Sequence, residues 1–172
     1  MAGYEVSIES LPRCGFLDLR GGEAVREKCC AYLDITLPTV ANTLVSTADD
    51  RLVHCISSDH WLLQLPGGLE TEVLEGLELA VADISHSFVD VSDLYERVQL
   101  SGSEAREVLV QGISLDLHPR AFPVGSSART GFAKTTVQLV CLDNSPTFVL
   151  TVFSSYLQYV LDWLNIAAAK TP

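Results

Sequence analysis

Residues 19–24 read LRGGEA, and the segment returns 81 positions later as LSGSEA at residues 100–105. Each copy places a glycine turn between an apolar residue and a Glu-Ala pair, which indicates a strand, a turn and the start of a helix. A second match pairs WLLQL at residues 61–65 with FVLTV at residues 148–152, which lie 87 positions apart. Two matches in the same order predict that the chain consists of two similar halves.

The halves are expected at roughly residues 14–83 and 84–169, inside a single domain that spans residues 1–172. This period is too long for a solenoid repeat. Each half follows the order strand, helix, strand or hairpin, strand, helix. The predicted fold class is therefore α+β, with two pseudo-symmetric ferredoxin-like (βαββα) halves. The expected helices cover residues 23–33, 69–81, 104–110 and 156–169, and the expected strands cover residues 15–19, 43–47, 51–57, 61–65, 88–91, 95–100, 132–142 and 147–153.

Two local features are predicted from residue type. Ala48-Asp49-Asp50 lies between two β-forming runs, which indicates a hairpin turn. Ser103 precedes an expected helix, and its hydroxyl can accept a hydrogen bond from an N–H group at the helix start.

The net charge restricts the class of partner. The chain has 22 acidic and 11 basic side chains, a formal charge of −11 and a pI near 4.6. Nucleic acids and anionic membranes are polyanions, so neither is an expected partner. Charged residues make up 19 % of the chain, below the roughly 25 % of average soluble domains. This composition fits either a subunit that buries surface against a partner or a small, well-filled domain.

The sequence also predicts a compartment. The N-terminus lacks the basic start and apolar run of a signal peptide, and no apolar stretch approaches the roughly 18 residues of a membrane span. These features predict a cytoplasmic protein. The chain has five cysteines, and because their spacing fits neither a disulfide framework nor a zinc site, buried reduced thiols are expected. The cysteines are Cys14, Cys29, Cys30, Cys55 and Cys141.

No sequence motif predicts a catalytic or metal site. The histidines His54, His60, His86 and His118 are not spaced as helical metal ligands, and no G-x-S-x-G nucleophile motif occurs. Gly67-Gly68 lies between a strand and a helix, where backbone N–H groups can hold an anion. The glutamates at positions 70 and 72 would repel that anion, so a simple turn is favoured.

The most distinctive segment is LDLHPRAFPVG at residues 115–125. Its two prolines keep it extended, and Pro119 biases the preceding residue away from helix. His118, Arg120 and Phe122 are side chains of the kind that anchor protein interfaces. They are therefore the candidate subunit-interface residues. The alternative is an ordered connecting loop in which Phe122 fills the local core.

Three segments together resemble the gamma subunit of heterotetrameric sarcosine oxidase. They are FVDVSD at residues 88–93, RVQLSG at residues 97–102 and SLDLHPRAFP at residues 114–123. The third is the most specific of them. Shorter matches are FVL at 148–150, SSYL at 154–157, DWL at 162–164 and, in the first half, WLLQLP at 61–66.

This resemblance implies a fold similar to the folate-binding domain of aminomethyltransferases. It also implies a non-catalytic assembly subunit, with alpha, beta and delta subunits as partners. Such a complex demethylates sarcosine to glycine, yields hydrogen peroxide and passes the one-carbon unit to tetrahydrofolate. In that family FAD, FMN and NAD belong to the large subunits and zinc to the delta subunit. No catalytic, cofactor-binding or metal-binding residue is carried over to this chain, and Asp90, Asp93 and Glu96 are only loose candidates for a folate-binding acid.

Three alternatives remain open from the sequence. The chain can be the gamma subunit of a related N-methyl amine dehydrogenase complex. It can be a stand-alone folate-binding aminomethyltransferase-like protein, with a pocket between its halves to which Trp61, Asp93, Tyr95 and Phe132 contribute. Finally, it can be an interaction scaffold unrelated to sarcosine.

Overall fold

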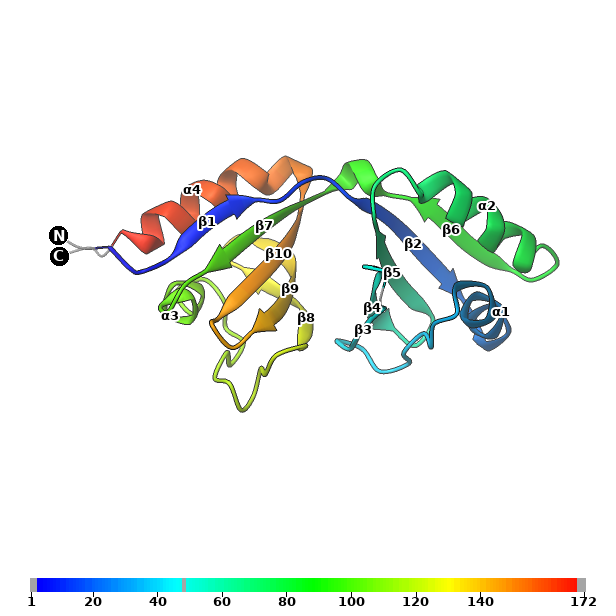
Figure 1. Cartoon of the computed structure of the whole chain (residues 1–172), viewed down its shortest axis with the longest axis horizontal. Helices are drawn as coiled ribbons and strands as arrows, with labels where there is room; N and C mark the ends of the chain where they lie inside the picture. Colours follow the sequence, from blue (N-terminus) through cyan, green and yellow to red (C-terminus); the bar gives the residue numbers. More distant parts are fainter. Residues whose placement is uncertain (1–2, 48, 170–172) are drawn as a thin grey trace. The chain divides into compact units, whose positions relative to one another are not determined.

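The computed structural model describes residues 3–47 and 49–169. The chain divides into two compact units, each built on one five-stranded sheet (Figure 1). The middle unit is Arg13–Ser92, and the terminal unit combines the residues up to Pro12 with those from Asp93 onward. The chain therefore crosses between the units twice.

The middle unit has two helices and an antiparallel sheet with the strand order β3-β4-β5-β2-β6. Its elements are β2 (Gly15–Gly21), α1 (Glu23–Leu33), β3 (Leu44–Ser46), β4 (Leu52–Ser57), β5 (His60–Leu65), α2 (Glu70–Ala80) and β6 (His86–Asp90). Without the short edge strand β3, this is the βαββαβ order of a ferredoxin-like fold, with each helix joining strands that are not direct neighbours.

The terminal unit has the strand order β1-β7-β10-β9-β8, again antiparallel. Its elements are β1 (Ser7–Ser10), β7 (Tyr95–Ser101), α3 (Ala105–Leu109), β8 (Ser127–Phe132), β9 (Thr135–Asp143), β10 (Thr147–Phe153) and α4 (Leu157–Ala168), with the short 3-10 turns η1 (Ser92–Leu94) and η2 (Ser154–Tyr156) before β7 and α4. Strand β1 occupies the edge position that β6 holds in the middle unit.

The internal repeat is confirmed at the level of strand register. Strand β2 corresponds to β7, β5 to β10 and α2 to α4. In the middle unit Cys55 pairs with Trp61 across β4 and β5. In the terminal unit Cys141 pairs with Phe148 across β9 and β10. The predicted α+β class with two ferredoxin-like halves is therefore confirmed.

Each unit has its own hydrophobic core, because alternate strand residues face the helices of that unit. In the middle unit, Leu17, Leu19, Trp61 and Leu63 lie buried against α1 and α2. The core of the terminal unit forms in the same way from β7, β9, β10, α3 and α4. Its larger buried side chains are Leu100, Leu109, Leu117, Phe122, Phe132, Leu139, Phe148, Leu150 and Leu164.

Two sequence predictions need correction, and one strand was not predicted. Residues 132–142 are not one strand, because β8 and β9 form a hairpin that turns at Ala133, where φ is 48°. Ser103 does not cap α3. Its hydroxyl donates a hydrogen bond of 3.0 Å to Glu5 Oε2, from the segment before β1. Strand β1 was not predicted from the sequence. The expected β3–β4 hairpin is present, although Ala48 lies outside the described residues.

Gly102 is the position in the turn after β7 where only glycine fits. Its φ is +128°, and a Cβ atom there would lie 2.2 Å from the carbonyl oxygen of Glu5. The glycine of the recurring segment thus lets the chain before β1 approach the turn closely.

Candidate functional site

The loop that connects α3 to β8 differs from its counterpart after α1. Helix α1 of the middle unit has 11 residues, whereas α3 has 5. Residues 110–126 then form an irregular segment before β8, drawn in yellow-green below α3 in Figure 1. This segment contains the predicted interface residues.

Arg106 on α3 attaches this loop to the sheet. Its Nη1 atom donates a hydrogen bond of 2.5 Å to the carbonyl oxygen of Leu117. Its guanidinium carbon lies 5.0 Å from the centre of the Phe148 ring, a cation–π contact. Its Nη2 atom also lies 3.8 Å from the Cys141 sulfur. One side chain therefore joins α3, the loop, β9 and β10.

A surface groove of about 540 Å³ lies between α3 and the first part of the loop. Leu117 and Ile113 are almost fully buried there, whereas Val110 is 53 % exposed. The groove is lined by Arg106, Glu107, Val110, Ile113, Leu115, Asp116, Leu117, His118 and Pro119. It has an apolar interior with ionisable side chains around it.

The three predicted interface residues have different environments. His118 and Arg120 are exposed. The Arg120 N–H donates to His118 Nδ1 over 3.2 Å. Phe122 is only 5 % exposed and packs into the terminal core. The Phe122 side chain therefore takes the alternative role, as a core residue that holds the loop down. His118 and Arg120 remain candidate interface residues.

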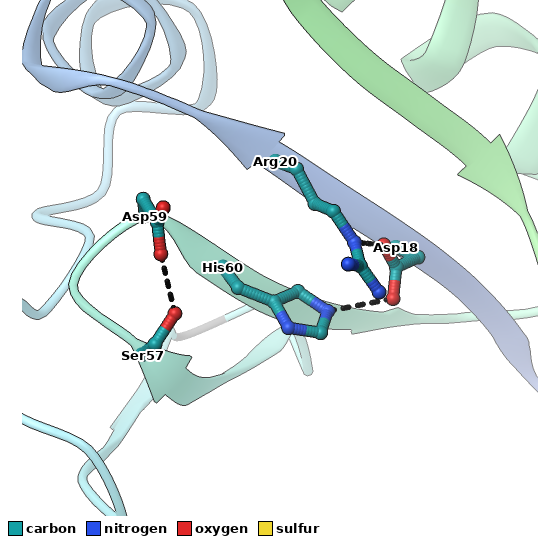
Figure 2. Close-up of polar contacts among 5 residues, drawn as sticks. All are labelled: Asp18, Arg20, Ser57, Asp59 and His60. Atoms are coloured by element: carbon teal, nitrogen blue, oxygen red, sulfur yellow. Dashed lines mark hydrogen bonds and ion pairs between the residues drawn. The ribbon is translucent and has the colours of Figure 1, made fainter.

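A second polar site lies in the middle unit, on the sheet face opposite its helices (Figure 2). Asp18 and Arg20 are two residues apart on β2, so both point to that face. The Asp18 carboxylate contacts His60 Nε2 at 2.7 Å and Arg20 Nε at 2.8 Å. Burial alone would raise the Asp18 pKa, but the hydrogen bonds from Arg20 and His60 outweigh it and hold that pKa below its usual value.

The geometry of this cluster fits a structural ion network better than a catalytic triad. A Ser-His-Asp triad needs the hydroxyl group on the imidazole. Here the Ser57 hydroxyl donates to Asp59 over 2.5 Å, and His60 Nε2 is engaged by Asp18. Figure 2 shows these as two separate pairs. This cluster was not predicted from the sequence, because Asp18 and His60 lie 42 positions apart. Their alternation on adjacent strands was the only signal.

The other two histidines also lie outside any metal cluster. His54 is 1 % exposed on β4, and burial lowers its pKa to about 4. His86 contacts Glu78 at 2.8 Å and the Ile84 carbonyl oxygen at 2.6 Å, and these bonds raise its pKa. Within residues 3–47 and 49–169, no group of three or more His, Cys, Asp and Glu side chains is placed to hold a metal ion.

The Gly67-Gly68 turn has a ligand from its own chain. The N–H of Gly68 donates to Glu70 Oε2 over 2.7 Å. A carboxylate thus already occupies the position an external anion would take, which agrees with the expected turn.

The five cysteines are free thiols, but the expected burial holds for only three of them, because Cys14 and Cys30 are half-buried. Cys29, Cys55 and Cys141 are buried, and burial together with the neighbouring Cys30 raises the Cys29 pKa to about 12. A thiol with so high a pKa is a poor nucleophile at neutral pH.

Two of the three aromatic residues proposed for a folate pocket, Trp61 and Phe132, are fully buried. Trp61 is fully buried in the middle core, and its Nε1 atom donates to the carbonyl oxygen of Pro38 over 2.6 Å. Phe132 is fully buried in the terminal core against Trp163. Tyr95 stacks on Phe153 at 5.2 Å, and Asp93 is exposed. The prediction is therefore wrong for Trp61 and Phe132, whose rings lie inside the two cores.

No helix formed by the described residues is both long enough and apolar enough to cross a membrane.

Comparison with known proteins gives consistent matches. The curated sarcosine oxidase subunit gamma of Corynebacterium sp. (strain P-1) is 27 % identical over 166 residues, which cover 96 % of this chain and 76 % of that protein. Among solved structures, the heterotetrameric sarcosine oxidase of Corynebacterium sp. U-96 superposes with a TM-score of 0.88 at 22 % identity, over 98 % of this chain and 86 % of the matched chain.

A more distant structure has the same fold. The glycine cleavage system aminomethyltransferase T of Bartonella henselae superposes with a TM-score of 0.67 at 11 % identity, over 95 % of this chain and 46 % of that protein. This confirms the expected similarity to the aminomethyltransferase fold.

The family itself is established by sequence. The sarcosine oxidase gamma subunit family matches residues 23–170, which include most of both units. The chain therefore belongs to the sarcosine oxidase gamma subunit family.

Proposed function

We propose that this chain is a structural subunit of a cytoplasmic, heterotetrameric sarcosine oxidase, and that it supplies no catalytic group of its own. The observation that carries the proposal is the family match over residues 23–170. The expected partners are alpha, beta and delta subunits, which would hold FAD, FMN, NAD, zinc and the tetrahydrofolate site.

The overall reaction defines what these partners must do. Sarcosine, oxygen and tetrahydrofolate give glycine, hydrogen peroxide and methylenetetrahydrofolate. The N-methyl carbon is oxidised and transferred to tetrahydrofolate, while oxygen accepts two electrons and two protons. This chemistry needs a flavin and a folate site, and the buried positions of Trp61 and Phe132 leave neither ring for stacking on a cofactor.

The non-catalytic role is supported by how the polar groups are used. The Asp18 carboxylate binds Arg20 and His60, and the Glu70 carboxylate accepts the Gly68 N–H. In both sites the functional atoms bind groups of the same chain. The exposed residues of the distinctive loop, His118 and Arg120, are instead open to a partner.

The test is purification of this chain, together with the proteins bound to it, from its native host. With a tag on this chain, we expect a large flavin-coloured complex that consumes oxygen when sarcosine is added. A colourless chain that elutes alone would contradict the proposal. A panel of other N-methyl amines then distinguishes sarcosine oxidase from a related N-methyl amine dehydrogenase complex.

A control addresses the folate-binding alternative. The purified chain is titrated with tetrahydrofolate in the absence of partners, and the proposal predicts no saturable binding. Tight binding to the lone chain would favour an aminomethyltransferase-like function instead.

A further inference from the structure

We infer that the groove between α3 and residues 113–119 binds an extended segment of a partner subunit, with an apolar side chain next to a lysine or arginine. This inference rests on the proposed function, because it names the chemistry by which the chain would join its complex.

The interior of the groove is suited to an apolar side chain. Ile113 and Leu117 are 4 % and 1 % exposed, so they form a packed floor. Val110, at 53 % exposed, leaves an aliphatic wall in water. An apolar side chain bound here would bury the exposed surface of Val110. Burial of apolar surface is the main favourable contribution to most protein association.

The charges around the groove select a basic neighbour. Glu107 and Asp116 are exposed carboxylates that line it. Arg106 lines it too, but its guanidinium binds the Leu117 carbonyl and lies over Phe148. Its positive charge is therefore directed into the protein. The whole chain carries −11, so a basic partner segment is also attracted at long range.

His118 adds a directional hydrogen bond. Its Nδ1 atom accepts from the Arg120 N–H, so the neutral ring carries its proton on Nε2. Because the side chain is exposed at the groove, this N–H can donate to a backbone carbonyl of an extended segment. A backbone contact of this kind favours a strand-like rather than a helical ligand.

The groove is formed before any partner arrives. The Arg106 bond to Leu117 and the Asp116 Oδ1 bond to the His118 N–H, at 2.9 Å, fix both of its sides. Phe122 fastens the following residues into the core. Binding therefore orders few groups of this chain, which lowers its entropic cost.

The test measures assembly of tagged full-length chain with the partner subunits, using two pairs of variants. Val110→Arg places a charge on the apolar wall. Its matched control, Ile166→Arg, changes an aliphatic side chain that is 75 % exposed near the end of α4. Glu107→Lys reverses a charge at the groove, and Glu27→Lys reverses an exposed charge on α1.

We expect Val110→Arg to raise the Kd for assembly by at least about tenfold, the effect of disrupting a buried interface contact. Glu107→Lys should raise it several-fold and weaken its dependence on salt. Both controls should assemble like the wild type. Circular dichroism and thermal unfolding of each isolated variant check that it is folded.

The outcomes separate this inference from the proposed function. If the wild-type chain forms no complex, the proposed function fails. If the wild type assembles and Val110→Arg assembles equally well, the groove is not the docking site. Equal losses with Val110→Arg and Ile166→Arg would also overturn the inference, as would a complex that contains only a second copy of this chain.

Discussion

The middle and terminal units share a framework but attach their connecting loops differently. In the middle unit, the loop after α1 is bound directly by β5, because Trp61 Nε1 donates a hydrogen bond to the carbonyl oxygen of Pro38. In the terminal unit the equivalent aromatic is Phe148, which has no N–H group. Arg106 reaches across its ring and donates to the Leu117 carbonyl instead.

This difference shows where the repeat has become specialised. The register is kept, with Cys55 opposite Trp61 and Cys141 opposite Phe148. The charged cluster of the middle unit is not repeated in the terminal unit. In the strand register, Asp18 corresponds to Gln99 and His60 corresponds to Thr147. The middle unit thus has an internal ion network, and the terminal unit has a short helix and an open groove.

The largest expected effect comes from removing the aromatic side chain in either unit. Trp61→Ala and Phe148→Ala each delete a fully buried ring, so each should lower the free energy of unfolding by about 3–5 kcal/mol. Denaturant unfolding measures the loss, and hydrogen exchange should show it first in the mutated unit. A loss below about 1 kcal/mol for either variant would contradict the view that the two positions are equivalent.

The next largest effect is acid sensitivity of the middle unit. His54 corresponds in register to Val140 in the terminal unit. The folded-state pKa of His54 is about 4, below an unfolded value of about 6.5. The unfolded state therefore binds more protons between these values. The stability provided by neutral His54 is complete above about pH 6.5 and is lost as the pH falls toward 4.

The His54→Val variant isolates this contribution. Between pH 7 and pH 4, the wild type should lose up to about 3 kcal/mol more stability than the variant. Denaturant titrations at several pH values give the difference. Parallel pH curves for the two proteins would show that His54 is not responsible.

A smaller effect is expected when the terminal loop is released from the sheet. Arg106→Met keeps much of the aliphatic packing but removes the charge-assisted hydrogen bond to the Leu117 carbonyl oxygen. Loss of this bond should lower the free energy of unfolding by about 1.5–3 kcal/mol. Amides of residues 113–126 should then exchange faster, while those after α1 stay protected. Unchanged exchange in the loop would show that other contacts hold it.

The smallest effect is expected from the ion network. In the assembled complex, the double variant Asp18→Asn, His60→Gln should retain sarcosine-dependent oxygen consumption per flavin, because the cluster is proposed to be structural. A comparison of kcat with the wild-type complex measures this. A fall of about a hundredfold or more, typical for loss of a general acid or base, would place the cluster in the reaction.

Much of the fold was predictable because the strongest signals are local. The LRGGEA and LSGSEA segments place a strand end, a turn and a helix start correctly in both units. Strand β1 was not predictable, because Ser7–Ser10 has mostly exposed side chains and no apolar alternation of its own. It forms only because β7 offers a free edge, on which Ser7 pairs with Ser101 and Ser10 pairs with Val98.

The site was predictable only in part. The loop at residues 115–125 was recognised from its prolines and its anchor-like side chains. That Phe122 turns inward depends on the space beside Leu117 and Phe132, which sequence spacing does not show. Arg106 carried no signal either, because its partners Leu117, Cys141 and Phe148 come from three later segments.

The most direct measurement is hydrogen exchange of this chain, free and in complex with its partner subunits. We expect new protection at residues 107–120 of the terminal unit and none at the corresponding loop after α1, residues 34–43. Protection confined to residues 34–43, or no change at residues 107–120 in an intact complex, would contradict the claim that the divergent loop is the docking surface.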